Sequence, residues 1–302
     1  MSKIDRRKFL QQTMLGSAGF ILGSQTLNRH SIFSPMSEKI DQVVLGKSGV
    51  SVSRLAWGTG TNGWKRVSNQ TKLGMKKFLE IVEYALASGI TFFDAADIYG
   101  SHPYLKEVLK RIPREKIVIL SKIWTSSNDW LEFKGAQQAL DRFRTEIGTD
   151  YIDIVLLHCQ TSPHWISDRH QDRDMLSKAK QDGLIRAHGV SCHSLEALKT
   201  AAQSEWVDIL LARINNIGAR MDDKPDVVMP ILKQAHDAGK GVLGMKVYGC
   251  GELIKEEQRE GSLKFVLGSG NVDALTIGFE NVEQIADTIK RINRMVNEKK
   301  SN

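Results

Sequence analysis

The sequence predicts an α/β protein, a closed parallel barrel of eight βα units, and three observations support this fold class. Residues 37–302 number 266, close to the ~250 residues typical of a (β/α)8 barrel. Along this segment, short apolar runs alternate with amphipathic helical stretches. The apolar runs lack strict polar–apolar alternation, as expected for strands buried on both faces. Right-handed crossovers between such units close most simply into a single-domain TIM barrel.

The predicted strands are short runs rich in Val, Ile, Leu and Phe. They recur at intervals long enough for a helix to return the chain to the start of the next strand. We expect strands at residues 54–58, 91–95, 117–123, 152–158, 185–191, 208–214, 241–247 and 274–278.

Helical patterns fill the intervals between these strands. Gly89, Gly148, Gly183 and Gly239 each follow one of them, where a helix commonly ends on a residue in the left-handed conformation. The helical pattern is poor only near residues 256–265. We expect helices at residues 71–87, 103–110, 135–147, 172–181, 195–202, 226–238, 256–265 and 282–296.

A short extended pair, residues 43–45 and 49–53, precedes the first strand. It predicts a β-hairpin that plugs the bottom of the barrel. No internal repeat, low-complexity tract or linker divides residues 37–302, so they are expected to form one domain.

The composition is that of an ordinary globular protein, with 41% hydrophobic residues. The formal charge is +7, but residues 1–36 hold five basic residues and one acidic residue, which leaves 37 basic and 34 acidic residues in the rest. No basic stripe with interleaved aromatic residues is present, so nucleic-acid binding is not expected. Three cysteines without a CxxC pair form neither a disulfide framework nor a structural zinc motif.

The first 36 residues are interpreted as an export signal and linker. Arg6 and Arg7 precede a weakly apolar stretch, residues 14–23, which is too short for a stable membrane span. The segment resembles a twin-arginine (Tat) signal. The resemblance implies the Tat machinery as a partner and a periplasmic or other extracytoplasmic location, with a membrane anchor only if the signal stays uncleaved. Cleavage is expected between residues 23 and 36; an amphipathic helix with two chance arginines is the alternative.

Ionisable residues stand at three neighbouring strand ends. In a TIM barrel the chemistry lies at the carboxyl ends of the strands. Asp94 ends the second predicted strand and Tyr99 follows in the next loop, while Lys122 and His158 end the third and fourth strands. These four side chains are therefore expected to converge on one site.

Their residue types suit the reduction of a carbonyl. The hydride must come from a cofactor because no side chain supplies one, and the proton can come from a phenol. The ammonium of Lys122, held in place by Asp94, is expected to lower the pKa of Tyr99 from its ordinary value near ~10. His158 is expected to donate a hydrogen bond to the substrate oxygen and to orient it.

The order Asp-x4-Tyr, then Lys, then His at successive strand ends resembles the catalytic tetrad of the aldo-keto reductases. The stretch LGKSGVSVSRLAWGTG also resembles the opening of that family, and the likeness runs from about residue 43 to residue 292. The resemblance implies an oxidoreductase that uses NADP or NAD and interconverts a small-molecule carbonyl, an aldehyde or ketone, and its alcohol.

The cofactor residues implied by the family depart from its usual pattern. Ser191 is kept where the family has a Ser-Asn pair, but Cys192 replaces the asparagine. Met245 stands where an aromatic residue usually covers the nicotinamide, and Lys246 beside it is expected to contact the pyrophosphate. Asn215 has a loop-capping role as its alternative. The expected cofactor-binding residues are Gly58, Thr59, Ser191, Cys192, Asn215, Met245, Lys246, Gly278 and Gln284.

The strand-eight region bears on the choice of cofactor. Many family members hold the 2′-phosphate there with Lys and Arg, whereas this chain has Gly278 and Gln284 with Glu280 and Asp287 nearby. We therefore expect NAD(H) to bind at least as well as NADP(H).

Three tryptophans follow predicted strands and are expected to wall the substrate pocket. They are Trp64, Trp124 and Trp165, with ordinary loop packing as the alternative. The substrate itself is not identified by the sequence, because loop side chains rather than the fold select it.

Three other classes of protein compete with this interpretation. Gly58, Gly60 and Gly63 match G-x-G-x-x-G, and Glu80 stands where a ribose-binding acid would, which would indicate a Rossmann dehydrogenase, although no helix opens at Gly63. A metal-dependent barrel hydrolase is the second class, and a non-catalytic barrel that binds the cofactor is the third. The residues behind the hydrolase alternative are His158, Cys159, His188, Cys192 and His193.

Overall fold

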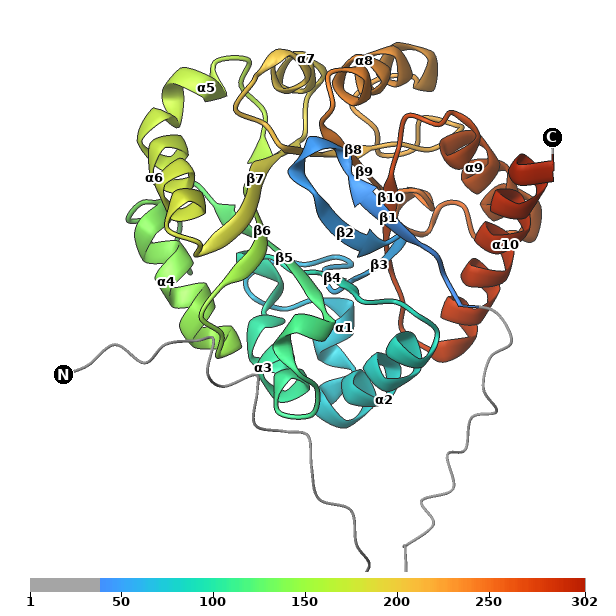
Figure 1. Cartoon of the computed structure of the whole chain (residues 1–302), viewed down its shortest axis with the longest axis horizontal. Coiled ribbons are helices and arrows are strands. Elements are labelled where there is room, and N and C mark those ends of the chain that lie inside the picture. The colour runs from blue at the N-terminus through green and yellow to red at the C-terminus, as the bar shows by residue number, and fades with distance from the viewer. Residues whose placement is uncertain (1–38, 302) are drawn as a thin grey trace, which may run out of the picture. The chain divides into compact units, whose positions relative to one another are not determined.

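The computed structural model (Figure 1) describes residues 39–301. The twin-arginine segment expected within residues 1–36 lies outside this range. Within the described part, no helix combines the length and the apolar character needed to cross a membrane.

Eight parallel strands close into one barrel, as the sequence predicts. Their order around the barrel is β10-β3-β4-β5-β6-β7-β8-β9, so each strand pairs with its neighbours in the sequence and the last pairs with the first. The strands are β3 (Leu55–Gly58), β4 (Phe92–Asp94), β5 (Val118–Trp124), β6 (Ile152–Gln160), β7 (Ile185–Cys192), β8 (Ile209–Arg213), β9 (Gly241–Met245) and β10 (Ala274–Gly278).

Two apolar clusters lie on the two sides of the barrel wall. Phe92 belongs to the cluster inside the barrel, and its neighbour Phe93 belongs to the cluster between the strands and the helices. Successive side chains of a strand point to opposite faces, and here both faces are covered. This double burial explains why the strands read as continuous apolar runs.

The predicted hairpin is present as β1 (Gln42–Leu45) and β2 (Val50–Ser53), paired antiparallel. Leu45, Val50 and Val52 belong to the same apolar cluster as the inward-facing barrel residues. Figure 1 shows the hairpin lying across one end of the barrel. It therefore closes the end opposite the strand carboxyl termini, as expected.

Helices surround the barrel (Figure 1). Gly89, Gly148, Gly183 and Gly239 all have positive φ, as their positions after helices predict. The helices are α1 (Asn69–Lys72), α2 (Gly74–Ala87), α3 (His102–Leu109), α4 (Ala136–Ile147), α5 (Trp165–Asp168), α6 (His170–Gln181), α7 (Leu195–Gln203), α8 (Pro225–Asp237), α9 (Glu256–Gly268) and α10 (Val282–Ser301).

Two differences from the predicted helices have local causes. The single helix expected at residues 71–87 is divided into α1 and α2, because Gly74 adopts φ +77°, outside the right-handed helical region. Ser68 caps α1 through a hydrogen bond from the Thr71 backbone N–H, so this helix begins earlier than predicted. The single turn α5 was not predicted, because four residues are too few to show a helical period.

Candidate active site

The four predicted catalytic side chains meet at the carboxyl end of the barrel. Asp94 is the last residue of β4, Lys122 lies near the end of β5, and His158 lies near the end of β6. Tyr99 closes a short 3-10 turn, Asp97–Tyr99, in the loop after β4. The barrel thus brings together residues separated by up to 64 positions, as the strand-end argument predicts.

A buried ion pair between Lys122 and Asp94 forms the centre of this site. The Lys122 ammonium also donates to the Ala95 carbonyl at 2.8 Å and lies 3.5 Å from the Tyr99 hydroxyl. Burial lowers the pKa of Lys122, and the adjacent Asp94 carboxylate opposes that shift. The lysine is therefore fixed between a carboxylate and a phenol.

Asp94 is held by a second strand that the sequence analysis did not single out. Thr276 on β10 donates a hydrogen bond of 2.7 Å to its free carboxylate oxygen. Thr59, after β3, donates from both its backbone N–H and its hydroxyl to the Asp94 carbonyl, each at 2.9 Å. A threonine is a common strand residue, so only the closed barrel reveals that Thr276 faces Asp94.

Two glycines of the G-x-G-x-x-G match make room for the Tyr99 ring. A Cβ at Gly60 would lie 2.2 Å from the ring, and one at Gly63 would lie 2.4 Å from it. These glycines follow a barrel strand, and no helix begins at Gly63. The closed barrel excludes the Rossmann alternative, and the glycines have a packing role instead.

The pKa of Tyr99 is raised well above its ordinary value, so the predicted lowering is wrong for this structure. Burial of the phenol is the largest cause, and the Asp94 carboxylate adds to it. The Lys122 ammonium does not reverse the shift because Asp94 already neutralises its charge. The phenol is consequently protonated at neutral pH, which is the form that donates a proton.

His158 lies beside Tyr99 and is neutral. Its ring meets the Tyr99 ring edge-on at 5.8 Å between centroids. Burial lowers the pKa of His158 well below its ordinary value, with further lowering by Lys122, His193 and Lys246. A neutral imidazole can donate one N–H while its other nitrogen accepts.

A polar network on α4 supports the turn that carries Tyr99, and the sequence analysis missed it. Arg142 binds both oxygens of the buried Asp97 carboxylate, each at 2.8 Å. Glu146, one turn further along α4, accepts hydrogen bonds from Arg66 at 2.6 Å and from His102 at 2.8 Å. The two Arg142 contacts tie the Asp97–Tyr99 turn to α4.

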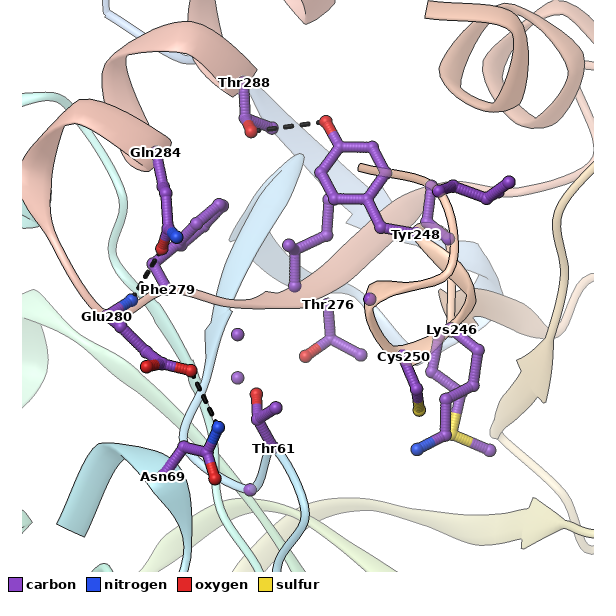
Figure 2. Close-up of a pocket in the computed structure, with 18 of the residues that line it drawn as sticks. Thr61, Asn69, Lys246, Tyr248, Cys250, Thr276, Phe279, Glu280, Gln284 and Thr288 are labelled. Atoms are coloured by element: carbon purple, nitrogen blue, oxygen red, sulfur yellow. Dashed lines mark hydrogen bonds between the residues drawn. The ribbon is translucent and has the colours of Figure 1, made fainter. Parts of the chain in front are cut away.

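Asp94 and Tyr99 open into a cavity of about 680 Å³. It begins at Asp94 and Tyr99 and extends past the loop after β9 to the first turns of α10. Figure 2 shows the residues that line it from three parts of the chain. The loop after β9 contributes Lys246, Tyr248 and Cys250, and α10 contributes Gln284 and Thr288. Thr61, Asn69 and Thr276 also line the cavity in this view. This volume is within the range of cofactor and small-molecule sites.

Five of the predicted cofactor residues line this cavity. They are Gly58, Met245, Lys246, Gly278 and Gln284. Gln284 accepts a hydrogen bond of 2.8 Å from the Glu280 backbone N–H and so shapes the turn that begins α10 (Figure 2). Tyr248 reaches Thr288 at 3.3 Å and joins the loop after β9 to the same helix.

The other predicted cofactor residues lie outside the cavity lining. Thr59 is occupied with Asp94 as described. The Ser191 hydroxyl accepts a hydrogen bond of 2.8 Å from the Cys159 backbone N–H, and Cys192 is fully buried. Asn215 donates to the Ala219 carbonyl at 2.7 Å and to the Lys246 carbonyl at 3.1 Å, so it caps loops, as its alternative interpretation holds.

The end of the cavity at α10 is rich in carboxylates. Glu280, Glu283 and Asp287 line it, together with one cation, Arg259 of α9. Arg259 lies 3.3 Å from Asp287. Arg291, later on α10, is already bound by Asp287, Glu260 and Glu256.

The three predicted pocket tryptophans divide into two environments. Trp64 is 47% exposed and meets Trp124 edge-on at 5.4 Å, and Trp124 in turn meets His158 at 5.6 Å. Trp130, which the sequence analysis missed, packs on Trp64 at 5.4 Å. Trp165 is buried in the outer core near Trp206, so its assignment to the pocket is wrong and its packing alternative holds.

The histidines and cysteines proposed for a metal site do not assemble. His188 stacks on Trp206 at 4.3 Å, and the rings of His158 and His193 lie 6.4 Å apart. Within the described residues, no three His, Cys, Asp or Glu side chains are grouped to hold a metal ion.

Comparison with known proteins identifies the family. Residues 54–301 match the model of the aldo/keto reductase family, so the chain belongs to that family. It is 24% identical over 201 residues to an NADH-specific methylglyoxal reductase of Escherichia coli, covering 61% of each chain. It is 31% identical over 166 residues to a 6-dehydroglucose reductase of Novosphingobium aromaticivorans, covering 49% of this chain and 50% of that one. The chain thus spans between half and two thirds of these curated relatives.

Solved structures share the fold. A Pseudomonas aeruginosa protein assigned to the aldo-keto reductases superposes with a TM-score of 0.72 at 22% identity, covering 87% of this chain and all of that one. An aldo-keto reductase of Bacillus halodurans in its holo form gives a TM-score of 0.67 at 18% identity, covering 84% and 91%.

The network on α4 predicts a pH-dependent contribution to stability. Burial alone would raise the pKa of Glu146, but the hydrogen bonds from His102 and Arg66 outweigh it and hold the pKa at about 2, against an ordinary 4.5. Because the folded-state pKa is depressed, the stabilisation is complete above pH 4.5 and is lost as the pH falls toward 2. At neutral pH about 3 kcal/mol is the upper bound, and solvent screening of this partly buried carboxylate reduces the contribution below that value.

Urea unfolding of wild type and Glu146→Gln from pH 7 to pH 3 tests this contribution. The wild type is expected to be more stable at pH 7, and the difference should shrink below pH 4.5. Glu115→Gln, a surface variant, controls for the loss of one carboxylate. A wild-type advantage that stays constant over this range would contradict the assignment.

Proposed function

We propose that this protein is a nicotinamide-dependent oxidoreductase that interconverts a small aldehyde or ketone and its alcohol, with Tyr99 as the proton donor. The observation that carries the proposal is the convergence of Asp94, Lys122, Tyr99 and His158 at one end of the 680 Å³ cavity. Membership of the aldo/keto reductase family supports the same reaction class.

The cavity suits a dinucleotide. Its lining runs from Asp94 and Tyr99 to the start of α10, and Gly58 and Gly278 have no side chain to separate a ligand from the backbone there. The first turn of α10 offers backbone N–H groups for a diphosphate. Met245 and Gln284 would hold the group, which when bound supplies the hydride.

Each protein side chain has a distinct part in the proton transfer. Tyr99 donates its phenolic proton to the carbonyl oxygen, because its raised pKa keeps it protonated until the oxygen becomes basic. Lys122 stabilises the phenolate that remains, since its ammonium lies 3.5 Å from that oxygen. Asp94 holds Lys122 in place, and neutral His158 orients the carbonyl by donating an N–H.

We also propose that the unphosphorylated cofactor binds at least as tightly as the phosphorylated one. The carboxylates Glu280, Glu283 and Asp287 would repel a 2′-phosphate and can accept hydrogen bonds from a ribose hydroxyl. The only cation on that part of the lining, Arg259, is engaged by Asp287. The E. coli relative described as NADH-specific is consistent with this preference.

Export by the twin-arginine route is proposed from the sequence of residues 1–36. Arg6 and Arg7 stand before a short, weakly apolar stretch. A protein that acquires its cofactor before export has reason to use a pathway for folded proteins.

Removal of the Tyr99 hydroxyl tests the proton donor. Tyr99→Phe is expected to lower kcat on an accepted carbonyl by ~10²–10⁴, the usual loss for a general acid, while cofactor affinity is kept. Tyr104→Phe is the matched control, because the Tyr104 hydroxyl bonds the Thr71 carbonyl outside the cavity. Normal turnover by Tyr99→Phe would refute the role. Cofactor binding without turnover by the wild type would favour the non-catalytic barrel.

Fluorescence titration of the purified protein with NADH and NADPH tests the cofactor preference. We expect a Kd for NADH equal to or lower than that for NADPH. A preference of tenfold or more for NADPH, about 1.4 kcal/mol, would contradict the proposal. In that event, loss of the preference in Arg259→Gln would identify the cation responsible.

Fractionation of cells tests the export route. Replacement of Arg6 and Arg7 by a pair of lysines is expected to leave the folded protein in the cytoplasm, because the twin-arginine pair is the recognised element. Unchanged export of the double variant would exclude the twin-arginine route. An Arg29→Lys variant, altered downstream of the pair, serves as control.

A further inference from the structure

Lys246 is a cation without a partner near the reacting groups. It follows β9 and lines the same cavity as Asp94 and Tyr99. Among the described side chains, nothing forms a hydrogen bond or an ion pair with its ammonium. Figure 2 shows Lys246 and Cys250 extending in the same direction from the loop after β9.

The other charges around the reacting groups are neutralised. Lys122 is paired with Asp94, and Arg213, at the end of β8, is paired with the fully buried Asp222. His193 is neutral, because burial, Arg213 and Lys246 bring its pKa to about 3. Of these cationic side chains, Lys246 is therefore the one whose charge has no partner among the described residues.

The backbone around Lys246 fixes this position. Lys246 has φ +60°, a conformation that costs a residue with a side chain about 1 kcal/mol or more and persists only where its surroundings enforce it. Its carbonyl accepts hydrogen bonds from Asn215 at 3.1 Å and from the Gly249 backbone N–H at 2.8 Å. Asn215 thus ties the Lys246 backbone to the loop after β8.

The effect of Lys246 on the histidines indicates the side of the cavity that its charge reaches. Its ammonium lowers the pKa of both His158 and His193. Both histidines lie at the ends of β6 and β7, whereas α10 and the carboxylates around it form the other end of the cavity. Because Lys246 also lines the cavity together with Tyr99, the proposed proton donor, its charge is available to a substrate held at that phenol.

We propose that Lys246 is a specificity-determining residue that binds a carboxylate on the substrate, so that the protein acts on oxo acids in preference to neutral carbonyls. One net positive charge matches a monoanionic carboxylate better than a dianionic phosphate. At an effective dielectric of about 20, opposite unit charges roughly 6 Å apart change a binding constant by about 100-fold. The inference rests on the proposed carbonyl reductase activity.

The test compares matched pairs of aldehydes with and without a carboxylate. One pair is succinic semialdehyde and butanal, and the other is 4-carboxybenzaldehyde and 4-methylbenzaldehyde. The wild type is expected to favour the acid by about 10- to 100-fold in kcat/KM in at least one pair. Lys246→Gln should abolish this preference, mainly through KM, and Lys246→Arg should keep most of it. Lys264→Gln, on the exposed face of α9, is the control for charge removal.

Two results would overturn the inference. The first is a wild type that reduces these aldehydes but favours the acid in neither pair, or a Lys246→Gln variant that keeps the preference. The second is a Lys246→Gln variant that loses activity equally on both members of a pair while its Kd for the cofactor rises. That pattern would assign Lys246 to the cofactor diphosphate instead.

A binding measurement separates this inference from the proposed function. If the wild type reduces neither member of either pair, the carbonyl reductase proposal fails for these substrates. Titration of the protein with 4-(hydroxymethyl)benzoate and with 4-methylbenzyl alcohol, followed by tryptophan fluorescence, still tests the anion site. Tighter binding of the acid by wild type than by Lys246→Gln supports the site, and equal binding refutes it.

Discussion

A lysine ammonium buried at the mouth of a barrel must have a counterion, and the arrangement of this site follows from that requirement. Lys122 is almost entirely buried, and an isolated charge there would be costly. Asp94 supplies the opposite charge from the adjacent strand β4. Because Asp94 is itself buried, its remaining oxygen needs a donor, which Thr276 provides from β10. The buried charge of Lys122 therefore links β4 and β5, which come early in the sequence, to β10, which is the last strand.

The phenol of Tyr99 depends on this pair and on a second layer of charges. Lys122 and the two glycines after β3 define where the ring lies. The turn that carries it is held by the bidentate contact of Arg142 with Asp97. The site is thus fixed on one side by the barrel strands and on the other by a surrounding helix, and the Tyr99 hydroxyl lies where the two meet.

The sequence predicts the framework well because the barrel repeats one simple unit. Strands covered on both faces read as apolar runs, and polar residues at the ends of those runs stand out, as Asp94, Lys122 and His158 do. The α4 network was not predictable, because Arg142 and Glu146 look like ordinary charged residues on a helix surface. Trp165 was misassigned for a related reason, since sequence position cannot distinguish a loop aromatic in a pocket from one in the core. The direction of the Tyr99 pKa shift depends on burial, which only the folded structure gives.

The packing of Gly60 and Gly63 against the Tyr99 ring also restricts how this protein can diversify. Any side chain at either position would occupy the space of the phenol, so a substitution there would displace the ring. Trp64, one residue further on, is 47% exposed and free of that restriction. Substitutions are therefore accommodated more easily at Trp64 than at the two glycines, which must stay without a side chain for as long as the phenol ring keeps its place.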